Sequence, residues 1–264
     1  MKLFLIIIII FLNLNNIELK CNQAWNGGGT GAWYRVDTSC EYSFLSTQLI
    51  YCLPTIILPS NLTSFSDGFY VSLGIFNRYN GVSLDIGLTF DYEKNKWFSY
   101  GNDRLGWKSG SISIDTKEIN CINVSLSIID DYIKYIIRTE NGSIILGEDI
   151  YVSSQIDPLL NLTKNSSNNF GFYRFDSIAQ NKETLKSGSQ MIHAQMTHWL
   201  FQLHSGEIVP AQQSNIALNV SGYSPGPCCT HDEINTINVY QQIKWNQSDI
   251  SINYLKFNKN TSDN

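Results

Sequence analysis

The longest stretch of regular patterning in the chain covers residues 67–115. Within it, apolar side chains recur at every second position over 69–75 and again over 84–90. This period of two is typical of half-buried antiparallel strands, because successive side chains of a strand point to opposite faces of the sheet. Asn80-Gly81 lies between the two runs, and this dipeptide readily adopts the positive φ values of a tight turn. The pattern therefore predicts a β-hairpin.

Short alternating runs of the same kind continue along the chain. Residues 121–129, 132–139 and 144–146 are separated by the polar turns Asp130-Asp131 and Asn141-Gly142, which predicts a three-stranded meander. We find no internal repeat and no sustained helical periodicity. The sequence therefore predicts an all-β protein, an antiparallel β-sandwich of the jelly-roll, concanavalin A-like type, with residues 21–264 forming a single domain.

Near the start of the chain, Lys2 is followed by an unbroken apolar run over residues 3–12. A membrane-spanning helix needs about 20 apolar residues, so this run is too short to span and is typical of a secretory signal peptide, which we assign to residues 1–20. An uncleaved signal anchor is the alternative. We expect a secreted, extracellular protein with no membrane attachment after signal cleavage.

The formal net charge is −5, and no cluster of lysine and arginine occurs anywhere in the sequence. Such a chain has no basic surface to attract a phosphate backbone. Nucleic acid is therefore excluded as an expected partner.

Six cysteines follow the signal-like segment, and in a secreted chain they are expected to form disulfides rather than to bind metal. They are Cys21, Cys40, Cys52, Cys121, Cys228 and Cys229. No CxxC motif is present, which argues against redox chemistry and against a zinc ribbon. Cys40 and Cys52 flank a short hydrophobic segment and are placed to link neighbouring strands.

The adjacent cysteines Cys228 and Cys229 would pair with each other only in a strained ring. Each is therefore expected to reach a distant partner, such as Cys121 or Cys21. The alternative is that one or two cysteines stay free if Cys21 is lost with the signal.

The sequence contains eight N-x-S/T sequons, which are acceptor sites for N-linked glycans in secreted proteins. They start at Asn61, Asn123, Asn141, Asn161, Asn165, Asn219, Asn246 and Asn260. A chain rich in asparagine and serine also generates sequons by chance. Asn123 is the most informative, because it lies on the polar side of a predicted strand.

Candidate catalytic groups form no recognisable motif. Glycoside hydrolysis needs two carboxyl groups about 5 to 9.5 Å apart. Asp85 and Asp91 lie on one side of a predicted strand, but nothing in the spacing singles out a partner for either. The other acids considered are Asp115, Glu148, Asp176 and Glu207. Taken singly, each acid is better explained as a solvated turn or strand-edge residue than as a catalytic group.

The four histidines, His193, His198, His204 and His231, have no metal-ligand spacing. His193 and His198 are an odd number of residues apart, so on a regular strand they would face opposite ways. No Gly-x-Ser-x-Gly motif is present either. We therefore expect no metal, no cofactor and no catalytic residue of a known motif.

A group of aromatic residues is the strongest binding signal. They lie around the predicted hairpin together with Asp85, and aromatic faces beside carboxylate and amide groups are what sugar rings stack on and hydrogen-bond to. The candidate ligand-binding residues are Tyr70, Asp85, Tyr92, Trp97, Tyr100 and Trp107. The alternative is that these aromatic side chains fill the sandwich core.

The order of strand-like segments resembles that of the concanavalin A-like lectins and glucanases, and within that fold it is similar to the secreted glutamic peptidases (eqolisins). The segments that carry the resemblance are Asp85-Ile-Gly-Leu-Thr-Phe90, Trp97-Phe-Ser-Tyr100, Gly110-Ser-Ile-Ser-Ile114, Thr139-Glu-Asn-Gly-Ser143 and Gly171-Phe-Tyr-Arg-Phe-Asp176. The resemblance implies a catalytic glutamine and glutamate at positions that here are Asp85 and about Gly171. Since glycine can be neither acid nor base, the resemblance implies the scaffold only.

These observations favour an extracellular carbohydrate-binding or matrix module without catalysis. The alternative is an acid hydrolase, either a glycosidase or a glutamic-peptidase-like enzyme, that uses Asp85 with a second carboxylate. A structural matrix or coat protein without a small ligand is the third reading.

Overall fold

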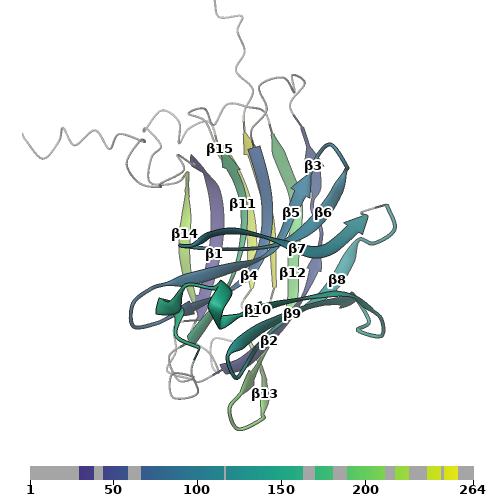
Figure 1. Cartoon of the computed structure of the whole chain (residues 1–264). Helices are drawn as coiled ribbons and strands as arrows, with labels where there is room; N and C mark the ends of the chain where they lie inside the picture. The colour runs from purple at the N-terminus through teal and green to yellow at the C-terminus, as the bar shows by residue number, and fades with distance from the viewer. Residues whose placement is uncertain are drawn as a thin grey trace, which may run out of the picture.

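The computed structural model describes residues 30–38, 44–58, 67–115, 117–162, 170–180, 189–211, 218–225, 237–244 and 247–254. These residues form two antiparallel sheets packed face to face (Figure 1). The predicted all-β sandwich is confirmed. None of the helices in these ranges is long and apolar enough to cross a membrane.

One sheet, which we call the front sheet, contains the predicted hairpin. Its strands, in spatial order, are β14 (Leu218–Pro225), β1 (Thr30–Thr38), β11 (Phe170–Gln180), β4 (Asp67–Asn77), β5 (Ser83–Asp91), β6 (Lys96–Asp103) and β7 (Gly106–Asp115). Strands β4 to β7 follow one another in sequence and in space, whereas β1, β11 and β14 are brought together from distant parts of the chain.

The second sheet, which we call the back sheet, is built around the long strand β12. Its spatial order is β10 (Ile145–Val152), β9 (Tyr132–Thr139), β8 (Cys121–Ile129), β2 (Phe44–Cys52), β12 (Gln190–Leu203), β16 (Gln247–Tyr254) and β15 (Ile237–Lys244). Two short strands, β3 (Thr55–Ile57) and β13 (Ile208–Pro210), also pair with β12. Two 3-10 helices, η4 (Ser153–Gln155) and η5 (Pro158–Leu160), follow β10.

The hairpin of β4 and β5 shows why the alternation predicts the fold. Leu73 and Ile75 of β4, and Leu84 and Ile86 of β5, are fully buried between the two sheets. Gly81 has a φ of 72°, which glycine adopts without the steric penalty of a side chain. The apolar positions therefore supply the core, and the alternate positions form the outer face of the front sheet, which is directed away from the back sheet.

The predicted meander is confirmed as β8, β9 and β10, but β10 continues to Val152, well beyond the predicted run. The apolar pattern stops at Gly147 because Asp149 takes an inward position. Its Oδ1 accepts hydrogen bonds from the backbone N–H and the hydroxyl of Ser111 on β7, both at 2.7 Å. Asp149 therefore joins the edge strands of the two sheets.

The disulfide found among the described residues links Cys52 to Cys121. These cysteines are direct cross-strand partners on β2 and β8. The expectation that Cys121 pairs with Cys228 or Cys229 is therefore wrong, because the neighbouring strand already presents Cys52 to it. Cys21, Cys40, Cys228 and Cys229 lie outside the described residues.

The core also contains charged side chains that the hydrophobic pattern does not predict. Arg174 and Asp176 of β11 are each only 1% exposed and face the back sheet. The Arg174 guanidinium lies 4.9 Å from the ring centroid of Trp199 on β12. The indole N–H of Trp199 in turn donates to the Thr47 hydroxyl at 2.8 Å. The centre of the sandwich is thus partly polar.

Candidate functional site: the outer face of the front sheet

A row of polar and aromatic residues crosses the outer face of the front sheet near one end of its strands. Trp107, Asn102 and Asp85 are direct cross-strand partners on β7, β6 and β5. On the other side, Asp37 of β1 is the partner of Tyr173 on β11. The strand register therefore aligns side chains that lie far apart in the sequence.

Gly74 of β4 leaves room on this face for an aromatic ring. A Cβ atom on Gly74 of β4 would lie 2.1 Å from the Tyr173 ring, so the ring rests directly over the glycine. Tyr173 thereby reaches across β4 and donates its hydroxyl to Asp85 Oδ1. Tyr100 is the cross-strand partner of Gly87 on β5, and its hydroxyl is hydrogen-bonded to Ser72 on β4.

Asp85 is half-buried, and burial raises the pKa of its carboxyl group above the ordinary aspartate value. The hydrogen bond from Tyr173 and the positive charge of Arg35 lower this pKa, while the negative charge of Asp103 raises it. The neighbouring carboxylate also raises the pKa of Tyr173, after the larger effect of burial. Tyr173 is therefore a hydrogen-bond donor at neutral pH.

Arg35 and Asp37 of β1 lie beside this pair. The Arg35 guanidinium lies 3.7 Å from the centroid of the Tyr173 ring, and its Nε donates to Asp37 Oδ1 at 2.5 Å. Burial raises the pKa of Asp37, and Arg35 opposes that rise. Both side chains keep some exposure, at 26% and 14%, so their polar ends border the solvent.

An aromatic stack occupies the other end of the row. Trp107 lies parallel to Tyr100, with ring centroids 4.5 Å apart and an interplanar angle of 1°. Tyr70 packs edge-on against both rings. Trp107 is 49% exposed whereas Tyr100 is 2% exposed, so the indole is the solvent-facing layer of a rigid stack.

The structure brings together four of the six candidate ligand-binding residues, namely Tyr70, Asp85, Tyr100 and Trp107. Trp97 is separated from them, because it is fully buried on the opposite face of β6 and packs against Phe90. Tyr92 lies in the turn between β5 and β6, at the far end of the strand from Asp85, and is 36% exposed.

The other candidate acids do not accompany Asp85. Asp91, Asp115 and Glu148 form ion pairs with Lys94, Lys96 and Lys134, respectively. Asp176 lies in the core, and Glu207 is exposed in the turn between β12 and β13. No group of three or more metal-ligating side chains occurs within the described ranges.

His193 and His198 are both exposed, and each has a positive φ, at 58° and 53°. Both lie where the register of β12 shifts against its neighbours. The expectation that His193 and His198 face opposite ways assumed a regular strand. Because β12 is irregular at both residues, the number of residues between them does not determine which way their side chains face. His204 is also exposed, and His231 lies outside the described residues.

Gly171, the second position implied by the glutamic peptidase resemblance, has no space for a carboxylate. A Cβ atom there would lie 2.3 Å from the Phe76 ring. The residue of β11 that contacts Asp85 is instead Tyr173. The pair at this site is therefore a carboxyl group and a phenol.

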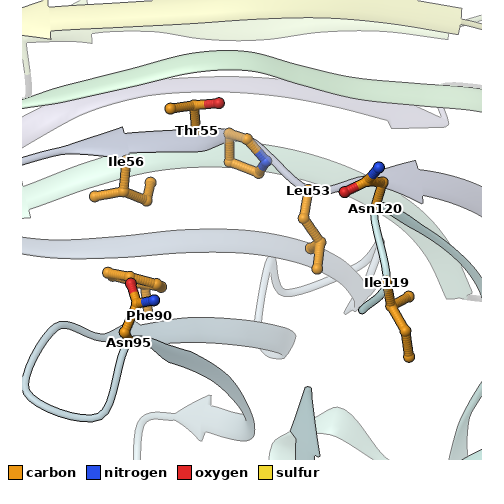
Figure 2. A pocket seen from close by; sticks show the side chains of 8 residues that line it. Leu53, Thr55, Ile56, Phe90, Asn95, Ile119 and Asn120 are labelled. Carbon is orange, nitrogen blue, oxygen red and sulfur yellow. The ribbon is translucent and has the colours of Figure 1, made fainter. Parts of the chain in front are cut away.

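A pocket of about 270 Å³ lies at a different place, between the two sheets (Figure 2). It is lined by Leu53, Pro54, Thr55, Ile56, Phe90, Asn95, Ile119 and Asn120. No lining residue is titratable. The pocket borders the Cys52–Cys121 disulfide through its sequence neighbours Leu53 and Asn120, and it is separate from the row that contains Asp85.

Three predicted sequon asparagines have described side chains, and none lies on the outer face of the front sheet. Asn123 is half-buried on β8, Asn141 is exposed in the turn after β9, and Asn161 is exposed after η5. For Asn219 only the backbone in β14 is described. Asn61, Asn165, Asn246 and Asn260 lie outside the described residues.

No family model and no curated protein matches the sequence. Among solved structures, the chain is similar to scytalido-glutamic peptidase in complex with a transition state analog inhibitor, with a TM-score of 0.50, 10% identity, and 85% of this chain and 98% of that chain covered. LamAcat from Zobellia galactanivorans also matches, with a TM-score of 0.32, 10% identity and coverage of 83% and 68%. At this identity the first match shows a shared sandwich fold, and the second carries no argument about function.

Three residues of the site, Arg35, Asp37 and Tyr173, were not among the sequence-based candidates. They lie on β1 and β11, whose pairing depends on contacts between distant segments. The available signal was Gly74, since a glycine within an alternating strand often marks the close approach of a large neighbour.

The raised pKa of Asp85 predicts how the unfolding free energy of the protein depends on pH. A carboxyl group whose pKa is raised by folding adds stability below its unfolded value of about 3.9, and this stability is lost as the pH rises through the folded value. Replacing Asp85 with asparagine removes this pH-dependent contribution while an oxygen remains to accept from Tyr173. We expect the variant to equal or exceed the wild type in unfolding free energy at neutral pH, with the advantage shrinking as the pH falls toward about 4.

Urea unfolding over this pH range measures the difference. The variant Glu148→Gln removes one negative charge from the back sheet and serves as the control, whose difference from the wild type is expected to be small. A neutral-pH loss in Asp85→Asn that exceeds the loss at acid pH would contradict the expectation.

Proposed function

We propose that the protein is a secreted, glycosylated β-sandwich that binds carbohydrate on the outer face of the front sheet. The observation that carries the proposal is the half-exposed Trp107 ring, stacked on buried Tyr100 in the same row as Asn102 and Asp85. An immobilised aromatic face loses little conformational freedom when a sugar ring stacks on it. The polar groups beside it supply hydrogen-bond donors and acceptors for hydroxyl groups.

Two further observations support the proposal. The side chain of Asn102 has no hydrogen bond to the described residues, so its carboxamide can both donate to and accept from a ligand. Asn123 and Asn141 lie on the back sheet and Asn161 after η5, so N-linked glycans at these three positions would leave the outer face of the front sheet accessible, whereas Asn219 of β14 is the cross-strand partner of Asp37 on the front sheet. Secretion with signal cleavage after residue 20, and a single domain over residues 21–264, are part of the same proposal.

Replacing Trp107 with alanine is expected to lower glycan affinity about tenfold, because an aromatic stacking contact contributes about 1 kcal/mol in addition to the buried area. A glycan array with the purified protein identifies the ligand, and isothermal titration of both proteins measures the affinities. Tyr79→Ala is the matched control, since Tyr79 is an 81% exposed aromatic residue in the turn between β4 and β5. Equal loss in both variants, or binding to no glycan, would refute the proposal.

An acid hydrolase that uses Asp85 is the competing proposal, and the raised pKa of this carboxyl group is the observation in its favour. Asp91 and Asp115 lie on the same face toward the other end of their strands and form ion pairs with lysines. Among the described residues, the other carboxylate of the row that contains Asp85 is Asp37. It lies three strands from Asp85, which corresponds to about 14 Å at the usual strand spacing. This exceeds the separation that glycosidases use. Turnover of pooled polysaccharides or denatured protein at acid pH, abolished by Asp85→Asn, would favour the hydrolase.

A further inference from the structure

The charged groups of the candidate site restrict the kind of glycan that it can take, an inference that rests on the proposed function. Around the row that contains Asp85, the described residues place one cation, Arg35, between two carboxylates, Asp37 and Asp85. Lys96 lies farther along the same face and is paired with Asp115. Asp103 adds to the negative potential at Asp85, although its own side chain is buried and hydrogen-bonded to Lys108 at 2.6 Å.

The Arg35 side chain already interacts with other side chains of the protein in the absence of a ligand. Its Nε contacts Asp37 at 2.5 Å, and its guanidinium is stacked on Tyr173 with a second aromatic ring, Phe76, at 5.8 Å. An arginine that binds a ligand carboxylate or sulfate normally presents two parallel N–H groups, and no protein carboxylate neutralises its charge. Here the neighbouring carboxylates cancel that attraction.

The carboxylate of Asp85 is placed to accept a hydrogen bond from a neutral ligand. Its Oδ1 receives the hydroxyl of Tyr173, and its Oδ2 has no partner among the described residues. Oδ2 can therefore accept a hydrogen bond from a sugar hydroxyl. The carboxamide of Asn102 on the adjacent strand can donate to ring and hydroxyl oxygens.

We propose that the outer face of the front sheet selects uncharged glycans and discriminates against glycans that carry uronic acid or sulfate groups. An anionic sugar placed beside Trp107 and Asn102 meets the Asp85 carboxylate without a free cation to balance it. Near a protein surface, two like charges a few ångströms apart cost about 1.4 kcal/mol or more. A difference of about 1.4 kcal/mol corresponds to a tenfold difference in affinity.

Affinity electrophoresis in gels that contain a single polysaccharide tests the proposal with the full-length secreted protein. The panel pairs uncharged glucans, mannans and xylans with polygalacturonate, alginate and heparin at low ionic strength. We expect retardation by uncharged glycans, at least about tenfold weaker retardation by the anionic ones, and a smaller difference between the two groups at higher salt.

The variant Asp85→Asn is expected to lower the ratio of affinity for uncharged over anionic glycans about threefold or more. The substitution removes one of the two carboxylates beside Arg35 but keeps an acceptor oxygen. Glu148→Gln changes the net charge equally on the back sheet and should leave the ratio unchanged.

The outcomes separate the two proposals. Preference for anionic glycans that is lost in Trp107→Ala would overturn the neutral selectivity and retain the carbohydrate site. An equal effect of Asp85→Asn and Glu148→Gln would assign any discrimination to net charge rather than to this face. Absence of binding to every glycan would overturn both.

Discussion

Replacing Trp199 with alanine should lower the free energy of unfolding by about 3 to 5 kcal/mol, which is a large part of the stability of an ordinary domain. Trp199 is fully buried, and its ring centroid lies 4.8 Å from that of Phe201. The substitution also removes the ring beneath the Arg174 guanidinium, and a desolvated cation–π contact contributes about 2 kcal/mol. Both effects act in the same direction.

Equilibrium denaturation in urea measures this loss. Trp107→Ala is the matched control, since it makes the same chemical change at a half-exposed site on the outer face, where the cost should stay within about 1 kcal/mol. Similar losses for the two variants would contradict the placement of Trp199 at the centre of the sandwich.

Removal of the Cys52–Cys121 disulfide should have the second largest effect. The two cysteines are 69 residues apart in sequence, so the chain-entropy relation gives a stabilisation of about 4 kcal/mol, with measured values of about 2 to 5 kcal/mol for native disulfides. For a chain of this size, the double variant Cys52→Ala, Cys121→Ala should unfold about 10 °C lower than the wild type.

Differential scanning calorimetry under oxidising and reducing conditions tests this expectation. Reductant should lower the midpoint of the wild type at least to that of the oxidised double variant. If the two oxidised proteins unfold at the same temperature, the disulfide does not constrain the unfolded chain. Asp131→Asn, in the turn between β8 and β9, provides a control for an exposed substitution in the same sheet.

The sequence predicted the strands of the sandwich where only one face is apolar. In β4 and β5 the alternation is clear, so the hairpin and its inward side follow from the sequence. In β6 the residues from Trp97 to Tyr100 are aromatic on both faces, and the pattern does not say which face is inward. The strand partners settle it, because Trp97 lies opposite Phe90 and Ile114.

The polar interior was not predictable from hydrophobicity. Arg174 and Asp176 alternate with the aromatic residues Tyr173 and Phe175, so a hydrophobic alternation would place the charges outside. The structure places them inside and the aromatic residues on the outer face. Local patterning cannot show this, because it depends on which rings and glycines the neighbouring strands present.

The site was predictable only where it is local in sequence. Tyr70, Asp85, Tyr100 and Trp107 belong to the consecutive strands β4 to β7, whose order in space follows their order in the chain. Arg35 and Tyr173 enter through β1 and β11, and no local signal gives the distance between two such segments. The sequence thus predicted the part of the site on β4 to β7 and missed the part on β1 and β11.

The packing of the Tyr173 ring over Gly74 provides a signature by which related proteins could be recognised. Gly74 leaves room for the Tyr173 ring to lie across β4 and reach Asp85. A side chain at position 74 would displace the Tyr173 ring. Related proteins that retain this site should therefore combine glycine at position 74 with tyrosine at position 173. Covariation of a small residue on one strand with a tyrosine on the next would therefore trace the site through sequences too divergent to align by identity.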